Sequence, residues 1–482
     1  MREPLLAKIL RYLIYTTAFV PLVIFSQFIS PFHFGKVVVF RSIVEIMAVF
    51  YLILIWNNRA YLPQRHILLT IFALFTLVFT VSTFISVNPY LSFWGSLERM
   101  GGLWSFIHYL VYFVILISVF RTQEDWLRLL KLAIFIGVLS ALYGFGQKTD
   151  IKFFIGSGDR ARIFGTIGNA ALFAGYQIIV LFLALSLAFS AWVSPKHKAY
   201  FYTAALISMV AVLMTAVRGS ILGMGVGFLL FAFLYTMTSP SRIARKILLG
   251  LVGLAIIFVG FALIFKNSNF VKSSGYLTRL TDFSFKTLTV QTRFWAWRAG
   301  IEGWKETPKT VLFGWGPENF NVPFSKHFNP KFFRGIGSET LFDRAHNMFV
   351  EIWVTMGLFG LLLYVAIFVA AYRIIWLRMV RGPDKVLGIG LISLITAYII
   401  HNSFIFDTSA NLLVFFTVLG FIVWLTRPNF STSTQGVVPQ SGSKNLGGQA
   451  PDSHYKLQTT HYKLTMGQQA LMLILLIGTA VL

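Results

Sequence analysis

Residues 344–369 read RAHNMFVEIWVTMGLFGLLLYVAIFV, and this stretch decides the fold class. It opens on polar residues at the end of a long polar segment and continues as an apolar run, which we predict as a helix over 347–374. About 20 consecutive apolar residues allow a helix to cross the hydrocarbon core of a bilayer. His346 therefore stands at the mouth of a predicted membrane helix, close to Arg344.

The composition of the whole chain agrees with a membrane protein. Its 482 residues are 56% hydrophobic and only 12% charged, whereas a soluble domain has about 25% charged residues. The first apolar run is long and others follow it, so we predict an anchor and not a cleaved signal peptide. The chain has no cysteine, which excludes disulfides, thiolate metal sites and cysteine nucleophiles.

Apolar runs recur along most of the chain, and they predict an all-α integral membrane protein with about 12–13 transmembrane helices. The predicted spans are residues 10–29, 37–56, 67–86, 103–120, 127–145, 169–191, 199–217, 220–237, 247–265, 347–374, 387–405, 409–426 and, as a weaker candidate, 466–482.

The distribution of positive charge orients these spans. Lysines and arginines gather in alternate connections, and the positive-inside rule places such connections, with the N-terminus, in the cytoplasm. The longest polar loop, about 266–346, is then extracytoplasmic, and we predict amphipathic helices within it. The connections at 87–102 and 146–168 and the turn at Arg218 fall on the same outer side.

Composition also divides the chain into segments. Residues 1–427 form the predicted polytopic membrane domain. Residues 428–464 are rich in Ser, Thr, Gln, Gly and Asn, which cannot bury a core, so we predict a flexible polar linker. Residues 465–482 are apolar again and are predicted to form an additional transmembrane helix.

The predicted outer side holds many arginines, although the positive-inside bias should deplete it of cations. An excess of Arg over Lys favours bidentate recognition of phosphate or carboxylate, so we predict an anionic substrate at the outer leaflet. The net charge of +24 does not indicate nucleic acid, because the basic residues are split between two membrane faces. The outer arginines are Arg99, Arg160, Arg162, Arg218, Arg293, Arg298, Arg334 and Arg344.

Two of these arginines lie in informative surroundings. Arg218 separates two apolar spans and is followed by the glycine-rich run 223–227, and a guanidinium near membrane depth is costly unless it is paired. Arg293 belongs to a predicted amphipathic helix, in which it shares a face with Trp297 and Gly300. Each arginine also fits an interfacial anchor that snorkels to headgroups, and this alternative stays open.

His346 is the one strong candidate for a base near these cations, and neighbouring arginines would keep it neutral. A capping or interfacial histidine is the alternative. His401 and Asp407 flank another outer helix end and are weaker candidates for supporting groups. Glu351 is predicted to have a structural hydrogen-bonding role. The outer side has no closely spaced carboxylate pair and no His-x-x-x-His, so we predict no metal site.

Several segments together resemble the O-antigen ligase and polymerase superfamily over roughly residues 80–425. They occur in a consistent order and on the same predicted side of the membrane. The segments are Asn88–Gly102, Gly165–Asn169, Ala216–Gly219, Phe313–Phe320, and Ala345-His346-Asn347 leading to Glu351, Gly357 and Gly360.

The resemblance implies a GT-C-like glycosyltransferase of the bacterial cytoplasmic (inner) membrane with its active site on the extracytoplasmic face. Such enzymes take a glycan from undecaprenyl pyrophosphate and pass it to lipid A core, a polysaccharide or a protein hydroxyl, without a metal or another cofactor. The catalytic residues of ligases match Arg218, Arg293 and His346, although Arg298 is close to Arg293. The further residues that we expect to bind substrate are Arg99, Arg160, Arg162, Arg298 and Arg344.

Alternatives remain at this stage. Within the superfamily, an O-antigen ligase, a polysaccharide polymerase and a protein O-oligosaccharyltransferase are not separated by the sequence. A flippase or exporter of lipid-linked sugars would also use outer arginines, but it would need charges inside the membrane and usually internal repeats. A peptidoglycan polymerase of the cell-shape and division class relies on an outer aspartate and lacks the Arg–His grouping.

Overall fold

The computed structural model describes residues 3–427, apart from 29, 157–161, most of 239–263, 274–277, 279–287, 334–339 and 383. The predicted linker and last span, 428–482, and most of the predicted span 247–265 lie outside the described residues. The described residues form helices and connections, with no strand among them.

The described helices follow one another in this order: α1 Leu5–Thr17, η1 Val20–Leu22, α2 Phe34–Asn57, η2 Arg59–Tyr61, α3 Ile67–Phe84, α4 Pro89–Trp94, α5 Leu103–Val119, α6 Gln123–Gly146, α7 Ala170–Phe189, α8 Pro195–Met214, α9 Arg218–Thr238, η3 Phe265–Asn267, α11 Asn269–Lys272, α13 Leu288–Trp304, α14 Pro308–Phe313, α15 Asn321–Lys326, η4 Pro330–Phe332, α16 Met348–Ile375, η5 Trp376–Val380, α17 Lys385–Asn402 and α18 Ser409–Leu425.

The described helices confirm the predicted all-α membrane fold. Within the described part of the chain, nine helices are long and apolar enough to cross a membrane, and α5 and α18 are shorter apolar helices. Predicted and observed ends generally differ by a few residues, because helix ends are set by caps and turns, which hydropathy does not detect.

The bounds of the first predicted span, 10–29, are wrong. Helix α1 begins at Leu5 and ends at Thr17, and a 3₁₀ turn follows at Val20–Leu22. Pro21 lies in this turn and has no N–H with which to continue a helix. The buried amine of Lys36 then donates to the carbonyl oxygens of Val23 and Thr166, at 2.6 and 2.7 Å, and fastens the connection to the bundle.

Helices α7 and α17 lie at the centre of the bundle, and nearly all of their residues are buried. Both are apolar on every face, as expected of helices surrounded by other helices. Glycines let α9 approach them closely: a Cβ atom at Gly223 would lie 2.6 Å from the carbonyl oxygen of Ala397. Small residues at such a crossing are what lets two membrane helices pack this closely.

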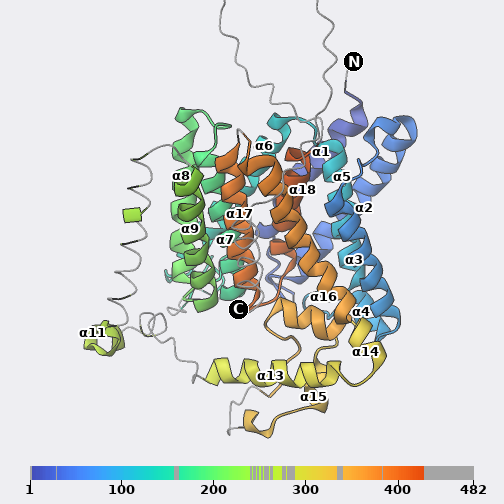
Figure 1. Ribbon diagram of the computed structural model, residues 1–482, viewed down its shortest axis with the longest axis vertical. Helices are drawn as coiled ribbons and strands as arrows, with labels where there is room; N and C mark the ends of the chain where they lie inside the picture. The colour runs from blue at the N-terminus through green and yellow to red at the C-terminus, as the bar shows by residue number, and fades with distance from the viewer. Residues whose placement is uncertain are drawn as a thin grey trace, which may run out of the picture. The chain divides into compact units, whose positions relative to one another are not determined.

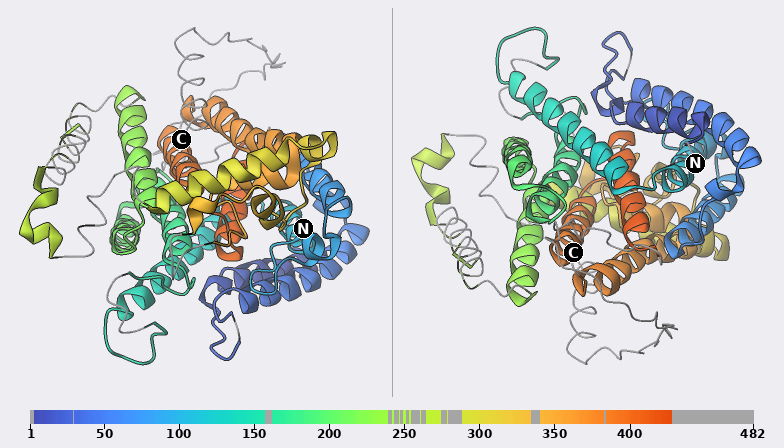
Figure 2. Two further views of the ribbon diagram at one scale, coloured as in Figure 1. Left: turned by 90° about the horizontal axis from the view of Figure 1, so that it is seen from below. Right: turned by 90° about the horizontal axis from the view of Figure 1, so that it is seen from above.

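Helices α13, α14 and α15 cover one end of the bundle, which we call the loop end. Helix α13 runs across this end in Figure 1, and Figure 2 shows it crossing the ends of the bundle helices. The connection 87–102 joins the same assembly, since Val87 N donates to Trp315 O at 3.2 Å and Ser92 Oγ to Pro317 O at 2.7 Å. Two segments predicted to be outer thus lie together.

A break inside α16 attaches this loop assembly to the membrane helices. Gly357 has φ 66°, which interrupts the helix, and a Cβ atom there would lie 2.4 Å from the backbone of Leu312. Trp315 N donates to Val354 O at 3.1 Å and Gly316 N to Thr355 O at 2.8 Å. The turn after α14 therefore satisfies carbonyl groups that the broken helix leaves unpaired.

Candidate active site

His346 lies in the last turn before α16 and is held there by its neighbours. Its ring makes edge contacts with Phe342 and Phe406, with centroids 5.5 Å away in each case. The side chain of Asn347 caps α16 by accepting from the N–H groups of Phe349 and Val350. This cap fixes where the helix begins and therefore where the imidazole stands.

The imidazole makes one hydrogen bond that sets its tautomer. His346 Nδ1 lies 3.2 Å from the carbonyl oxygen of Arg344. A carbonyl oxygen can only accept, so Nδ1 carries the proton in the neutral ring. Nε2 then presents a lone pair, which is the arrangement that a general base requires.

The electrostatic surroundings keep His346 neutral. Burial lowers the pKa of His346 to about 4, and the positive charge of Arg293 on α13 acts in the same direction. The hydrogen bond to Arg344 and the charge of Asp343 oppose this shift. Arg293 therefore lies near enough to His346 to influence its protonation, as the prediction of a site that contains both residues requires.

Arg218 begins α9 after a tight turn in which Ala216 has φ 51°. This turn packs on the segment between α17 and α18: a Cβ atom at Gly219 would lie 2.7 Å from the side chain of Phe404, and Ser220 Oγ lies 2.9 Å from His401 Nδ1. Phe406 in the same segment contacts the His346 ring. The Arg218 turn and His346 thus pack on one short segment, 401–406.

Arg344 is buried in a network of carboxylates. It forms ion pairs with Glu318 and, at 3.3 Å, with Glu351. Glu318 also accepts from Ser96 N at 3.3 Å, and Glu351 accepts from Ala345 N at 2.7 Å. The network therefore ties the connection 87–102 and the turn after α14 to the residue before His346. The predicted hydrogen-bonding role of Glu351 is confirmed.

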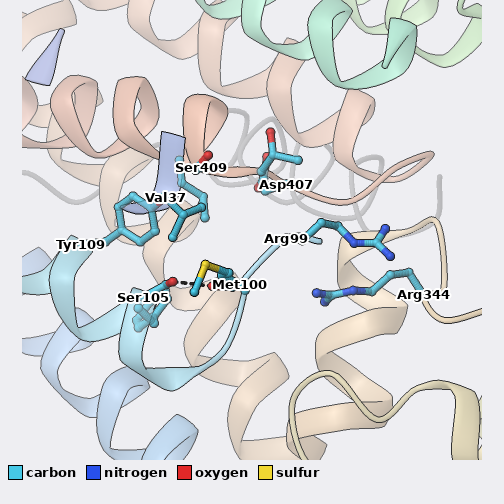
Figure 3. A pocket seen from close by; sticks show the side chains of 12 residues that line it. Val37, Arg99, Met100, Ser105, Tyr109, Arg344, Asp407 and Ser409 are labelled. Carbon is cyan, nitrogen blue, oxygen red and sulfur yellow. Dashed lines mark hydrogen bonds between the residues drawn. The ribbon is translucent and has the colours of Figure 1, made fainter. Parts of the chain in front are cut away.

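Arg99 approaches the same region from the connection before α5. It forms an ion pair with Asp343, and Glu98 lies 3.6 Å away. The guanidinium groups of Arg99 and Arg344 both lie over the Phe406 ring, 5.1 and 5.7 Å from its centroid. Figure 3 shows the two side chains next to each other at the edge of a pocket that Asp407 also lines.

The other predicted arginines lie in different settings. Arg162 donates to the carbonyl oxygen of Thr215 at 2.8 Å, beside the Arg218 turn. Arg298 is exposed on α13, whereas the charge of Arg293 lowers the pKa of His346. Of these two arginines, Arg293 is therefore the better candidate for the site. Arg160 and Arg334 lie outside the described residues.

Strained backbone conformations occur in the segments that carry the family resemblance. Among the described residues, the non-glycine residues with positive φ are Met100, Ala216, Glu318 and His346. Such conformations cost on the order of 1–3 kcal/mol each and persist where the surroundings impose them. Each of these residues belongs to a segment that carries the family resemblance, so the strain is concentrated at the loop end around His346 and Arg218.

Sequence reasoning missed two groups that shape this site. Glu318, in the turn 314–320, is an ion-pair partner of Arg344. Trp297 was placed on the face of Arg293, and its indole Nε1 donates to Ala345 O at 2.7 Å. An acidic residue in a cation-rich outer loop is the one signal that points to Glu318, and nothing in the sequence indicates the partner of Trp297.

The fold and the loop-end cluster together define a multi-pass, all-helical membrane protein with arginine and histidine side chains gathered at one end of its bundle. Comparison with known families gives a more specific similarity. Residues 203–365 match the family model described as O-antigen ligase. The predicted resemblance to the O-antigen ligase superfamily is therefore confirmed, and the matched range includes Arg218, Arg293 and His346.

A curated relative gives a more distant comparison. An uncharacterized protein of Haemophilus influenzae (strain Rd) is 25% identical over 240 residues, which cover 47% of this chain and 57% of the relative. The chain thus spans little more than half the length of the curated relative that it matches.

Proposed function

We propose that this protein transfers a glycan from a polyprenyl diphosphate carrier, undecaprenyl pyrophosphate, to an acceptor hydroxyl at the extracytoplasmic face of the bacterial inner membrane. The observation that carries the proposal is the contact of His346 Nδ1 with the carbonyl oxygen of Arg344, which leaves Nε2 to accept a proton. Burial and the nearby charge of Arg293 lower the pKa of this imidazole. The match of residues 203–365 to the O-antigen ligase family supports the same class of reaction.

In the proposed reaction, His346 Nε2 accepts the proton of the acceptor hydroxyl. The hydroxyl oxygen attacks the anomeric carbon from the face opposite the diphosphate, and the bond from that carbon to the diphosphate oxygen breaks. The bonding electrons leave with the diphosphate, so the anomeric configuration inverts. General-base assistance of this kind contributes on the order of 100- to 10,000-fold in rate.

Arg218 and Arg293 are the residues that we assign to the diphosphate. Guanidinium groups form bidentate hydrogen bonds with phosphate oxygens and stabilise the charge that develops on the leaving group. Diphosphate is a good leaving group, so the scheme needs neither a general acid nor a metal ion.

Transfer by purified protein in detergent, with an undecaprenyl-pyrophosphate-linked glycan and a candidate acceptor, tests the proposal. We expect His346→Ala and Arg218→Ala to lower the rate by about 100-fold or more while the unfolding temperature stays within a few degrees of that of the unaltered chain. Leu362→Ala is the matched control, because Leu362 is exposed on α16 far from the loop end. A wild-type rate in either site variant contradicts the assigned role.

The acceptor class is a separate question within the proposal. Mass spectrometry of glycans in a deletion strain separates the candidates: long carrier-linked chains indicate a lost ligase, single repeat units a lost polymerase, and unmodified proteins a lost protein O-oligosaccharyltransferase. Movement of the lipid-linked sugar between leaflets without any transfer would instead indicate a flippase or exporter.

A further inference from the structure

A buried hydrogen bond joins the helix that begins with Arg218 to the end of α17. Ser220 Oγ lies 2.9 Å from His401 Nδ1, and Ser220 stands two residues after Arg218 in the first turn of α9. Both partners are almost completely buried, with 0 and 1% of their surfaces exposed. Figure 1 shows the two helices side by side. The bond is therefore a direct link between α17 and the turn that presents Arg218.

Glycines enclose the imidazole of His401 on two sides. A Cβ atom at Gly175 in α7 would lie 2.2 Å from His401 Nε2. A Cβ atom at Gly223, one turn further along α9, would lie 3.3 Å from the backbone nitrogen of His401. The absence of side chains at these positions lets both helices approach the ring closely. The backbones of α7 and α9 thereby hold the imidazole against Ser220.

The second ring nitrogen of His401 shows that this imidazole is not the most stabilising side chain for its place. His401 Nε2 is buried and has no hydrogen-bond partner among the described residues. An unsatisfied polar atom inside a helical bundle is destabilising, whereas an apolar side chain of similar size would avoid that cost. What the imidazole adds is the hydrogen bond to Ser220. This bond therefore matters more for where it holds α9 than for the stability of the bundle.

The other side of the Arg218 turn is anchored separately. Arg162 Nε donates to the carbonyl oxygen of Thr215 at 2.8 Å, and Ala216 follows with a φ of 51°. The turn is thus held by Arg162 before Arg218 and by His401 after it. Loss of the second anchor would let the first turn of α9 shift relative to α17. A guanidinium that binds phosphate oxygens through paired hydrogen bonds depends on its direction as well as its distance.

His401 also stands at the start of the segment that reaches the candidate base. Phe406, five residues later, contacts the His346 ring with centroids 5.5 Å apart. One short segment therefore separates the residue assigned to the donor diphosphate from the residue assigned to the acceptor hydroxyl. A misplacement of about 1 Å between reacting groups can lower a rate by about 100-fold.

We infer that His401 is a positioning residue of the candidate site: through Ser220 it holds the first turn of α9 where Arg218 can bind the donor diphosphate. The inference rests on the proposed function, because it deepens the role assigned there to Arg218. His401 itself touches no substrate in this scheme, since it is buried. The competing explanation is a hydrogen bond that only stabilises the bundle, because polar side chains commonly join membrane helices in this way.

A binding measurement separates the two explanations. The Kd for farnesyl diphosphate is measured with purified full-length protein in detergent. His401→Leu removes the hydrogen bond and keeps an apolar side chain in place, and Ser220→Ala removes the same bond from the other end. Both are also made in a chain that carries Arg218→Ala. Tyr372→Phe is the matched control, because the Tyr372 hydroxyl lies 2.7 Å from Thr396 Oγ1 in a buried hydrogen bond that joins α16 to α17.

We expect His401→Leu and Ser220→Ala each to raise the Kd roughly tenfold, and the double variant to raise it no further, because both remove one bond. Neither should weaken binding further in the Arg218→Ala chain, which has no guanidinium left to position. His401→Asn, which can place an amide group near the position of Nδ1, should restore most of the affinity. Tyr372→Phe should leave the Kd unchanged.

Two results overturn the inference and leave the bond a purely structural one. The first is an unchanged Kd in His401→Leu and in Ser220→Ala, and Ser220→Ala decides alone if His401→Leu does not fold. The second is an equal further loss of binding in the Arg218→Ala chain. If Arg218→Ala binds farnesyl diphosphate as tightly as the unaltered protein, the donor role of Arg218 is wrong and the inference falls with it. Failure of the proposed function is recognised separately, as the absence of glycan transfer by the unaltered protein.

Discussion

At the scale of single residues, the backbone conformation of His346 sets the direction in which its imidazole points. Its φ of 52° lies in the left-handed region, which costs a non-glycine residue about 1–2 kcal/mol. Hydrogen bonds on both sides of Ala345, from Trp297 to its carbonyl and from its N–H to Glu351, hold this conformation. The ring is thereby directed between Phe342 and Phe406.

The lowered pKa of His346 leads to a prediction about pH. A histidine acts as a base only when it is neutral, and burial with the charge of Arg293 brings the pKa of His346 to about 4. We therefore expect the imidazole to stay neutral well below pH 6.5, so that transfer loses the contribution of His346 only as the pH falls through about 4. The measurement is the rate of glycan transfer with saturating donor between pH 3.5 and 8.

Two variants test the cause of this shift. Arg293→Lys keeps the positive charge and should keep the low pH limit, whereas Arg293→Gln removes it and should move the limit of the residual activity upward. Asp407→Asn removes another group that titrates in this range, near pH 7. A limit near pH 6.5 in the unaltered protein would mean that the imidazole is not buried as described.

At the scale of secondary-structure elements, the break in α16 positions the site. Helix α16 supplies the residues that follow His346, and the turn after α14 is inserted against its interruption at Gly357. Gly314 is equally constrained, because a Cβ atom there would lie 2.2 Å from the carbonyl carbon of Thr355. These close contacts therefore fix the position of the loop assembly relative to the first turns of α16.

This geometry predicts that Gly357→Ala is disruptive. A methyl group would meet the backbone of Leu312 at 2.4 Å at a residue whose φ is 66°, so both strain and overlap oppose it, by about 1–3 kcal/mol or more. We expect a lower unfolding temperature in detergent and loss of glycan transfer.

Gly225→Ala in α9 is the matched control. A Cβ atom there meets nothing within 4 Å, and alanine favours a helix over glycine by up to about 1 kcal/mol. Its unfolding temperature should therefore stay equal or rise. Equal behaviour of the two variants would show that the break at Gly357 is not required.

At the scale of the whole molecule, segments far apart in the chain meet at the loop end. The connection 87–102, the turn 314–320 and the residues before α16 are joined through Arg344 and its carboxylate partners. The loop assembly also shares a small hydrophobic core with α16, which includes Phe324, Phe342 and Val354. The candidate site therefore depends on the assembly of several loops and not on one motif.

The proposed orientation predicts opposite labelling of the two ends of the bundle. Leu341 is exposed at the loop end, and Trp56 is 87% exposed near the last turn of α2, away from the pocket that Val37 lines at the start of that helix. In intact spheroplasts, a membrane-impermeant maleimide should label Leu341→Cys and should label Trp56→Cys only after lysis. The reverse pattern would place the candidate site in the cytoplasm.

The helices of this protein could be predicted from the sequence because each span is locally apolar and a bilayer admits little else. Caps and breaks were harder to predict. The first span was given the wrong bounds although Pro21 lies within it, and the interruption at Gly357 left no mark in the hydropathy of 347–374. Hydropathy measures the transfer of side chains into lipid and carries no information about φ at a single glycine.

What the sequence determined by itself is the membrane class, the approximate helices and the residue types of the candidate site, because these follow from local composition and from the segments that resemble a family. Only the tertiary structure decided which charges pair. From the sequence, Arg344 and Arg99 were expected to bind an anionic substrate, yet each forms an ion pair with a carboxylate of the protein. The partner of Arg344, Glu318, lies 26 residues away in the chain. Electrostatic pairing depends on distances in space, and loops set those distances only when the whole bundle has assembled.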